Sequence, residues 1–277
     1  MTEYLSYQFT DNQDVVNTFD ELPLWSAAFG LLLLKHVHLQ PDITVLDLGS
    51  GTGFPLIELA ERLGTSCKLY GLDPWKNAND RARHKIQSYG LRHVEVLDGS
   101  ADNIPFDNDS IDLVVSNLGV NNFDNAPVVF QECHRVLKPK GKLALTTNLD
   151  GHWKTFYQVF EDTLLQLGKT QEAEQLLEQQ AHRGTTESVS RLFSTNGFKV
   201  TRFYQDTLEM HFLDGSALLN HHFVKLGWLS SWRDFLPEEE RVRIFTALEV
   251  NLNASAKKSG GLHLTVPMLF MEGEKDA

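Results

Sequence analysis

A regular alternation of short apolar runs with helical segments, between residues 41 and 148, constrains the fold of this chain most. Five runs rich in β-branched and aliphatic residues, each bounded by turn residues, predict buried strands at 43–48, 68–72, 93–97, 111–115 and 142–146. Helices are predicted between them, at about 54–63, 77–89 and 126–137. Strands joined through helices pair in parallel through right-handed crossovers. The sequence therefore predicts an α/β fold with a doubly wound, mostly parallel, Rossmann-like sheet.

The segments on either side of this alternation are predicted to be mainly helical. Apolar residues crowd the stretch from Pro23 to His38, and Pro23 suits the first turn of a helix. After Asp150, helices are predicted at 153–167, 171–181, 185–195, 215–226 and 237–256, and strands at 198–203, 207–212 and 262–271. We therefore divide the chain into an N-terminal helical cap (1–40), a core (41–150), and a part that completes the sheet and adds helices (151–277).

Charge and cysteine content narrow the classes of function. Twenty-five Lys and Arg residues against 37 Asp and Glu give a net charge of −12, and both halves of the chain are acidic. Phosphate backbones and anionic membrane surfaces repel such a protein, so we expect neither partner. Cys67 and Cys133 lie far apart in apolar stretches and indicate neither a disulfide framework nor a metal motif. With no leader pattern at the start and no membrane-length apolar run, we expect a soluble, cytoplasmic protein.

The first predicted strand runs directly into a glycine-rich turn. Gly49, Gly51 and Gly53 alternate with other residues there, and such glycines let the backbone bend sharply and a ligand approach without a Cβ clash. The spacing is one residue shorter than the dinucleotide fingerprint, and Asp47 precedes the first glycine by two residues. Asp73 ends the second strand, where a carboxylate can accept both hydroxyls of a ribose. Together these features predict an adenosine-bearing ligand.

Four motifs in this order resemble the class I S-adenosylmethionine-dependent methyltransferases, of the broad group called methyltransferase type 11. They are Asp47–Gly53, Gly71–Asp73, the pair 104–106 and 111–114, and His134–Gly141, and the match covers about residues 41–148. The resemblance implies that the glycine loop approaches the methionine part of the cofactor, Asp73 holds the ribose, and the loop after the third strand brackets the adenine. It implies a cofactor site made of Asp47, Gly49, Ser50, Gly51, Gly53, Asp73, Ser100, Ala101, Asp102, Asn117 and Leu118.

Three positions depart from the pattern of this family. Ser100 stands where many relatives carry an aspartate that accepts from the adenine amino group, so either Asp102 substitutes or backbone and water make the contact. Lys140 replaces a glycine in a structural turn that keeps Gly141. The stretch 116–119 lacks the Asn/Asp-Pro-Pro-Tyr/Phe signature that resembles amino-methylating nucleic-acid enzymes. With the acidic charge, this departure favours a small-molecule acceptor.

The acceptor side is less constrained by the sequence. Transfer from a sulfonium needs mainly in-line alignment and exclusion of water, and a general base matters only for a hydroxyl, thiol or carbon acid. His152, just after the fifth strand, has the best position for a base; the other candidates are Tyr157, His211, His221 and His222. A packed or surface role is the more frequent one for such residues. Neighbours on a helix point about 100° apart, so we expect His221 and His222 to hold no metal.

Aromatic residues on the same side suit an apolar or cationic acceptor, although helix packing explains most of them equally well. They are Trp25, Phe29, Trp153, Phe156, Tyr157, Phe223, Trp228 and Trp232. We hypothesise that the N-terminal helix, 153–181 and 215–256 form a lid over the acceptor. The predicted function is S-adenosylmethionine-dependent methyl transfer to a small molecule by in-line displacement. The alternatives are an NAD-type oxidoreductase and a non-catalytic S-adenosylmethionine-binding partner protein. The acceptor, the methylated atom and the oligomeric state stay open.

Overall fold

The computed structural model describes residues 2–21, 24–181 and 183–276, so Pro23, predicted to open a helix, lies outside the described residues. The chain forms two units. The sheet unit comprises Asp11–Asn148, Thr185–Asp206 and Met268–Ala277, and the helical unit comprises Met1–Thr10, Leu149–Gly184 and Thr207–Pro267. Residues 11–40 thus pack in the same unit as the predicted core. The predicted division at residues 40 and 150 assigns functions (cap, core and lid) to parts of the chain, and it stays a prediction.

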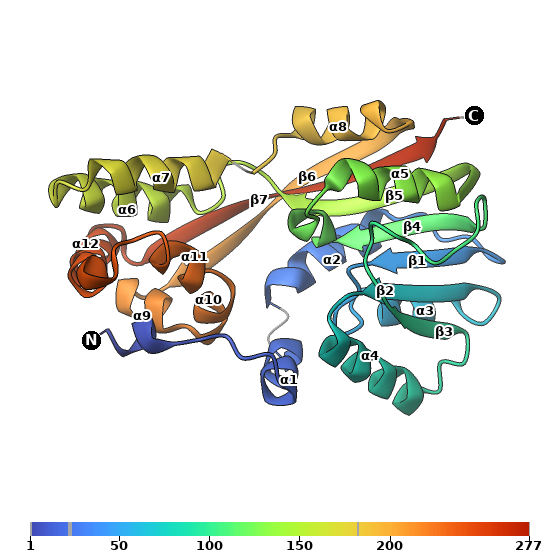
Figure 1. Cartoon of the computed structure of the whole chain (residues 1–277), viewed down its shortest axis with the longest axis horizontal. Coiled ribbons are helices and arrows are strands. Elements are labelled where there is room, and N and C mark those ends of the chain that lie inside the picture. Colours follow the sequence, from blue (N-terminus) through green and yellow to red (C-terminus); the bar gives the residue numbers. More distant parts are fainter. Residues whose placement is uncertain (1, 22–23, 182, 277) are drawn as a thin grey trace. The chain divides into compact units, whose positions relative to one another are not determined.

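One seven-stranded sheet has the order β3-β2-β1-β4-β5-β7-β6 (Figure 1). The first five strands pair in parallel, and β7 is antiparallel to β5. This confirms the predicted doubly wound, mostly parallel α/β sheet. The strands are β1 (Thr44–Leu48), β2 (Lys68–Asp73), β3 (Val94–Asp98), β4 (Ile111–Asn117), β5 (Leu137–Asn148), β6 (Phe198–Phe212) and β7 (Leu262–Lys275).

The register aligns the carboxyl ends of the strands that carry the sequence motifs. Leu48 lies opposite Leu72, and Asp73 lies opposite Asp98. Strand β1 pairs with β2 on one edge and with β4 on the other, so the order of the strands reverses at β1. In doubly wound sheets, ligands bind outside the carboxyl ends at such a reversal. The fold therefore places the glycine turn after β1 where a ligand is expected.

Helices in the sheet unit form where apolar residues recur on one face. In α3, the residues Leu56, Ile57, Leu59 and Ala60 are buried. Asn125 caps α5 by accepting the Val128 N–H. The short α1 was not predicted, because its sequence is mostly polar. The helices are α1 (Gln13–Glu21), α2 (Leu24–His36), α3 (Leu56–Leu63), α4 (Lys76–Tyr89), α5 (Ala126–Val136) and α8 (Thr186–Thr195).

The helical unit packs α12 against α6 and α9, around an apolar core that includes Phe156, Phe160, Trp232 and Phe245. The prediction of one helix over 215–226 is wrong. His221 has an extended backbone (φ −62°, ψ 128°), which ends one helix and begins the next. The helices are α6 (Lys154–Gln166), α7 (Thr170–Ala181), α9 (Gly215–Asn220), α10 (His222–Gly227), α11 (Leu229–Arg233) and α12 (Arg241–Ser259).

Strands β5 and β6 are longer than predicted. β5 begins at Leu137 and includes the turn-like residues Pro139 to Gly141, where Lys140 has a positive φ of 66° and the pairing with β4 shifts register. The two strands predicted at 198–203 and 207–212 form the single strand β6. Neither glycine nor proline occurs at 204–206, so nothing there obliges the strand to end.

Candidate functional site

The turn after β1 has the backbone geometry that glycine permits. Gly49, Gly51 and Gly53 have φ values of 74°, 49° and 101°, in the region that other residues rarely adopt. A Cβ at Gly53 would lie 2.8 Å from the Ile57 side chain, whereas a Cβ at Gly51 would meet nothing within 4 Å. Gly53 is therefore needed for close packing, and open space adjoins the backbone at Gly51. That space is where a ligand can approach the turn.

Asp73 joins this turn to the end of β2. Its Oδ2 accepts the backbone N–H of Gly51 at 2.9 Å, and its Oδ1 accepts the N–H of Trp75 at 2.8 Å. The residue is 8% exposed. Burial raises the pKa of this carboxyl, and the two N–H groups offset part of the rise. Each carboxylate oxygen has a further lone pair, so Asp73 can still accept hydrogen bonds from two hydroxyls.

Asp47 is fully buried at the centre of the sheet. No donor among the described residues gives either of its carboxylate oxygens a hydrogen bond of ordinary geometry. Burial, with a smaller contribution from the charge of Asp73, raises the pKa of Asp47 to about 8, and the backbone N–H of Leu56 offsets part of this. Buried carboxyls without partners are rare and concentrate at functional sites. A cation or an N–H donor brought to Asp47 would stabilise its ionised form.

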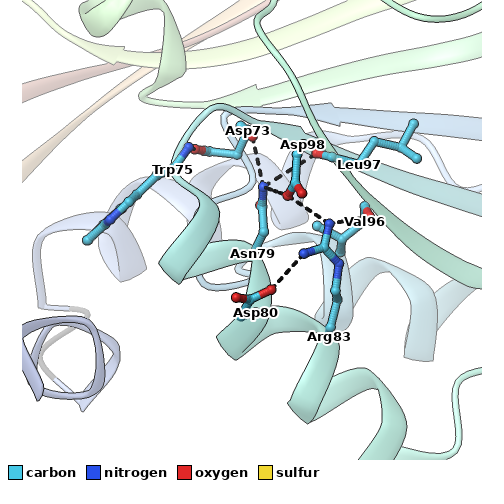
Figure 2. Close-up of polar contacts among 8 residues, drawn as sticks. All are labelled: Asp73, Trp75, Asn79, Asp80, Arg83, Val96, Leu97 and Asp98. Carbon is cyan, nitrogen blue, oxygen red and sulfur yellow. Dashed lines mark hydrogen bonds and ion pairs between the residues drawn. The ribbon is translucent and has the colours of Figure 1, made fainter. Parts of the chain in front are cut away.

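Asn79 on α4 fixes the backbone around Asp73 (Figure 2). Its buried amide donates to the Asp73 carbonyl oxygen at 2.8 Å and to Asp98 Oδ1 at 2.8 Å. Arg83 also donates to Asp98 Oδ1, at 2.7 Å, and its hydrogen bond lowers the pKa of Asp98. Asn79 therefore ties the ends of β2 and β3 together. The sequence reading missed it; the signal was a polar residue on the buried face of α4, beside Ala78 and Ala82.

The predicted adenine residues lie in the loop after β3. Ser100 and Asp102 are exposed, whereas Ala101 is 9% exposed. The N–H of Gly99 donates to the Asp73 carbonyl oxygen at 3.2 Å, which fastens the start of this loop to the carboxyl end of β2. Asp102 is thus on the same loop as Ser100, and the choice between Asp102 and a contact made by backbone and water stays open.

Asn117 and Leu118 end β4 on the other side of β1. The Asn117 amide is engaged within the protein, because it donates to the Ser26 carbonyl at 3.0 Å and accepts from the Thr146 hydroxyl at 2.7 Å. Leu118 has a left-handed backbone (φ 66°), and its N–H donates to the Thr146 carbonyl at 3.0 Å. Asn117 therefore holds α2 and β5 to β4, a structural role in addition to the predicted binding role.

The unpredicted helix α1 is fastened beside the glycine turn. Its Asp20 forms ion pairs with Arg81 at 2.9 Å and Lys85 at 2.6 Å on α4. Burial opposes ionisation of Asp20, but hydrogen bonds from Lys85, Thr52 and Arg81 outweigh it and lower the pKa. Thr52 belongs to the glycine turn, so Asp20 links α1 both to α4 and to the turn. An isolated acidic residue in a polar stretch carries no sequence signal for this role.

His152, the predicted base, lies in the helical unit and is 2% exposed. Its ring stacks on Trp153, with centroids 5.0 Å apart and planes 17° apart, and on Trp228 at 6.0 Å and 18°. Burial lowers the pKa of His152 well below 6.5, and the charge of Arg183 lowers it further. The imidazole is therefore neutral at pH 7, a form that can accept a proton but does so weakly.

Tyr157 and most of the predicted aromatic residues are packed in the protein interior, whereas His211 lies at the surface. The Tyr157 hydroxyl receives hydrogen bonds from Arg183 at 2.9 Å and from the Trp232 indole at 3.2 Å. His211 lies 3.5 Å from Glu209 at the surface. Trp153, Phe156 and Trp232 are fully buried and form the core of the helical unit. Trp25 and Phe29 pack together in the sheet unit, with their ring centroids 5.2 Å apart.

Residues 2–21, 24–181 and 183–276 lack two classes of feature. This part of the chain contains no group of three or more His, Cys, Asp or Glu side chains arranged to hold a metal ion. It also contains no helix with the length and apolar character needed to cross a bilayer. The statement that His221 and His222 hold no metal stays a prediction.

Known proteins resemble this chain mainly through the core. Residues 46–145 match the family model described as a methyltransferase domain. A demethylmenaquinone methyltransferase from Oceanobacillus iheyensis is 33% identical over 140 residues, which are 49% of this chain and 59% of that protein. The chain thus spans less than two thirds of the length of the curated relatives that it matches.

Solved structures share the fold over more of the chain. The YcgJ protein from Bacillus subtilis aligns over 91% of this chain and 99% of its own, with a TM-score of 0.58 and 18% identity. A SAM-dependent methyltransferase from Aquifex aeolicus aligns over 71% of this chain and 92% of its own, with a TM-score of 0.52 and 21% identity. Residues 46–145 are thus a methyltransferase domain, and this domain is similar to those of the class I S-adenosylmethionine-dependent methyltransferases.

Proposed function

We propose that the protein transfers the methyl group of S-adenosylmethionine to a small-molecule acceptor by in-line displacement. One observation carries the proposal: Asp73 accepts the N–H of Gly51, so a ribose-binding carboxylate and an open glycine turn form a single site at the strand reversal. This arrangement suits a ligand that has a ribose beside a chain with a charged end. The methyltransferase domain at residues 46–145 favours S-adenosylmethionine over NAD, the ligand of the oxidoreductase alternative.

The residues present fit this cofactor. Asp73 would accept from the ribose hydroxyls, and the turn formed by Gly49, Ser50, Gly51 and Gly53 leaves room for the methionine part beside its backbone. Asp47 would gain a cation or an N–H donor in addition to the backbone N–H of Leu56. The loop residues Ser100, Ala101 and Asp102, with Asn117 and Leu118, complete the site in this proposal.

The chain's own task in the reaction is alignment and exclusion of water. When bound, the cofactor supplies an electrophilic methyl group on a sulfonium, whose leaving group is neutral. The protein therefore has to hold the acceptor in line and keep water out, which proximity and orientation provide. A base is needed only for an acceptor that must lose a proton, and His152 is the residue proposed for that case.

The acceptor proposed is a small organic molecule. The curated relatives are named as methyltransferases of demethylmenaquinone and of a phytyl naphthoquinone, which makes quinone-type rings the first acceptors to test. The net charge of −12 disfavours a polyanionic acceptor such as nucleic acid. That residues 151–277 cover the acceptor stays part of the proposal.

Titration calorimetry with S-adenosylmethionine, S-adenosylhomocysteine and NAD tests the cofactor. We expect both sulfur compounds to bind and NAD not to bind. Binding of NAD alone would reverse the choice between methyl transfer and redox chemistry. Methyl transfer is then tested with cofactor carrying a labelled methyl group, against demethylated quinols and a fractionated metabolite extract. Tight cofactor binding without label transfer to any fraction would favour the non-catalytic partner protein.

A further inference from the structure

A segment that precedes α2 contacts both arms of the candidate cofactor site. This segment, the N-terminal strap, comprises residues 11–21 and belongs to the sheet unit. The two arms are the glycine turn after β1 and the end of β2 with the residues that follow it. The N–H of Gly51, on the first arm, donates to Asp73 on the second. A segment that holds both arms can therefore set the geometry of this hydrogen bond.

Asp11, at the start of the strap, holds the second arm. Its Oδ1 accepts the indole N–H of Trp75 at 2.8 Å and the side-chain amide of Asn77 at 3.0 Å. Hydrogen bonds from Asn77 and Trp75 lower the pKa of Asp11, so the carboxylate is ionised at pH 7. The backbone N–H of Trp75 in turn donates to Asp73 Oδ1 at 2.8 Å (Figure 2). Asp11 therefore acts on Asp73 through one residue, because fixing the indole restricts the backbone of Trp75.

Asp20, near the end of the strap, holds the first arm. Thr52 in the glycine turn donates to its carboxylate, which also pairs with Arg81 at 2.9 Å and with Lys85 at 2.6 Å on α4. The Asp20 side chain is 13% exposed, so these contacts are largely shielded from water. The glycine turn is thereby fastened to α4, the helix that begins directly after Trp75.

The strap has the local structure of a stiff connector between these two contacts. The Asn12 side chain accepts the N–H of Val15 at 2.9 Å, and the Asn12 carbonyl accepts the N–H of Val16 at 3.1 Å. These bonds cap the start of α1, one residue after Asp11. Val16 is fully buried, and α1 packs against α4. Asp11 and Asp20 are therefore held at a fixed separation rather than on a flexible tail.

We propose that Asp11 and Asp20 are positioning residues of the cofactor site. The strap holds Trp75 and the glycine turn in the arrangement in which Asp73 accepts the Gly51 N–H and keeps lone pairs for a ribose. The choice of ligand rests on the proposed function, whereas the arrangement of the two arms does not. Because linkage is reciprocal, a cofactor that binds the arranged site also strengthens the docking of the strap.

Amide hydrogen exchange of the free protein tests the Asp11 contact without a ligand. Asp11→Ala should raise the exchange rates of the Trp75 and Gly51 N–H groups about tenfold or more, because both donate to Asp73. Asp11→Asn keeps one acceptor oxygen and should restore part of the protection. The N–H of Leu46, in the middle of β1, should exchange as in the native protein. Unaltered exchange at Trp75 and Gly51, or an equal rise at Leu46, would overturn the proposal.

Asp20→Ala tests the contact with the glycine turn in the same way. It should raise the exchange rates of the Gly51 and Gly53 N–H groups, while the Trp75 N–H changes less. The Gly53 N–H reports on the turn itself, because it donates to the Ser50 carbonyl at 2.8 Å. A rise confined to α1, with native exchange in the turn, would show that Asp20 fastens the strap without positioning the turn.

Calorimetry with S-adenosylhomocysteine measures the consequence for binding. Asp11→Ala and Asp20→Ala should each raise the dissociation constant about threefold to tenfold. Glu61→Gln, which removes an exposed carboxylate on α3, should leave it unaltered. So should Val189→Ala, which destabilises α8 where it packs on α5. An equal loss of affinity in Val189→Ala would reduce the effect of the aspartates to general stability and overturn the proposal.

The reverse effect of the ligand on the strap completes the test. Saturating S-adenosylhomocysteine should slow the exchange of the α1 amides in the native protein, a response that a merely structural strap would not give. Bound ligand with unaltered exchange in α1 would contradict the coupling. A native protein that binds no S-adenosylhomocysteine would refute the proposed function, whereas exchange in the free variants would still decide the positioning role of Asp11 and Asp20.

Discussion

Asp73 Oδ2 accepts the backbone N–H of Gly51 at 2.9 Å, and this hydrogen bond joins the ends of two neighbouring parallel strands. The carboxylate thereby holds the turn in the conformation that leaves open space at Gly51. The same carboxylate keeps lone pairs for a ligand. One side chain thus shapes the turn and presents a binding group, so its loss should affect both.

Removing the Asp73 carboxylate should weaken cofactor binding strongly. Asp73→Ala loses hydrogen bonds to the ribose worth about 1–3 kcal/mol each, which is at least a tenfold rise in the dissociation constant. Asp73→Asn keeps one acceptor oxygen and should fall between the native protein and the alanine variant. Calorimetry with S-adenosylhomocysteine measures the series. Glu95→Ala, which removes an exposed carboxylate on β3, is the matched control. Unaltered affinity in a folded Asp73→Ala variant would remove Asp73 from the site.

Asp47 should make the stability of the free protein fall as pH rises. Its folded pKa of about 8 lies above the value of about 3.9 for an unfolded chain, so the folded state binds the extra proton. The stabilisation is complete below pH 4 and is lost as pH rises through about 8, by up to about 1.4 kcal/mol per pH unit. Asp47→Asn has no proton to lose. Urea unfolding at several pH values should therefore show its stability relative to the native protein rising from pH 5 to 8 and then levelling. If the free energies of unfolding of the two proteins changed with pH in the same way, the raised pKa of Asp47 would be contradicted.

Asn79 should contribute to stability through the ends of β2 and β3. Asn79→Ala removes one donor from the Asp73 carbonyl and one of the two donors to Asp98 Oδ1, at an expected cost of about 1–3 kcal/mol. Urea unfolding monitored by circular dichroism measures the loss. Gln87→Ala, an exposed position on the same helix, should change stability by less than about 0.5 kcal/mol. If the two substitutions lowered the free energy of unfolding equally, the Asn79 hydrogen bonds would make no contribution to stability.

The parallel sheet and the glycine turn were predictable because both leave local signals. Buried strands need runs of β-branched residues, and the sharp turn at Gly49, Gly51 and Gly53 needs glycine. Asp73 was predictable because a carboxylate at the end of the second strand has a fixed place relative to that turn. Each of these features is signalled by the residue types in its own short stretch of sequence.

Features that depend on distant residues left no such signal. Asn79 acts through Asp98, 19 residues away, and α1 is held by Asp20 through Arg81, 61 residues away. The break between α9 and α10 comes at His221, a residue type without a strong helix-ending preference. Burial of His152 beside two indole rings depends on Trp228, which is 76 residues away along the chain. Tertiary packing decides each of these.

His152 should show whether the reaction uses a base in the helical unit. Burial keeps its pKa well below 6.5, so the neutral form is present throughout pH 6–8 and the native rate should have no step there from this residue. His152→Phe preserves a flat ring in contact with Trp153 and Trp228, so the variant should stay folded. If His152 accepts a proton in the transition state, kcat should fall about a hundredfold or more while KM for the cofactor is retained. A folded His152→Phe variant with native kcat would leave ring packing as the whole role of His152.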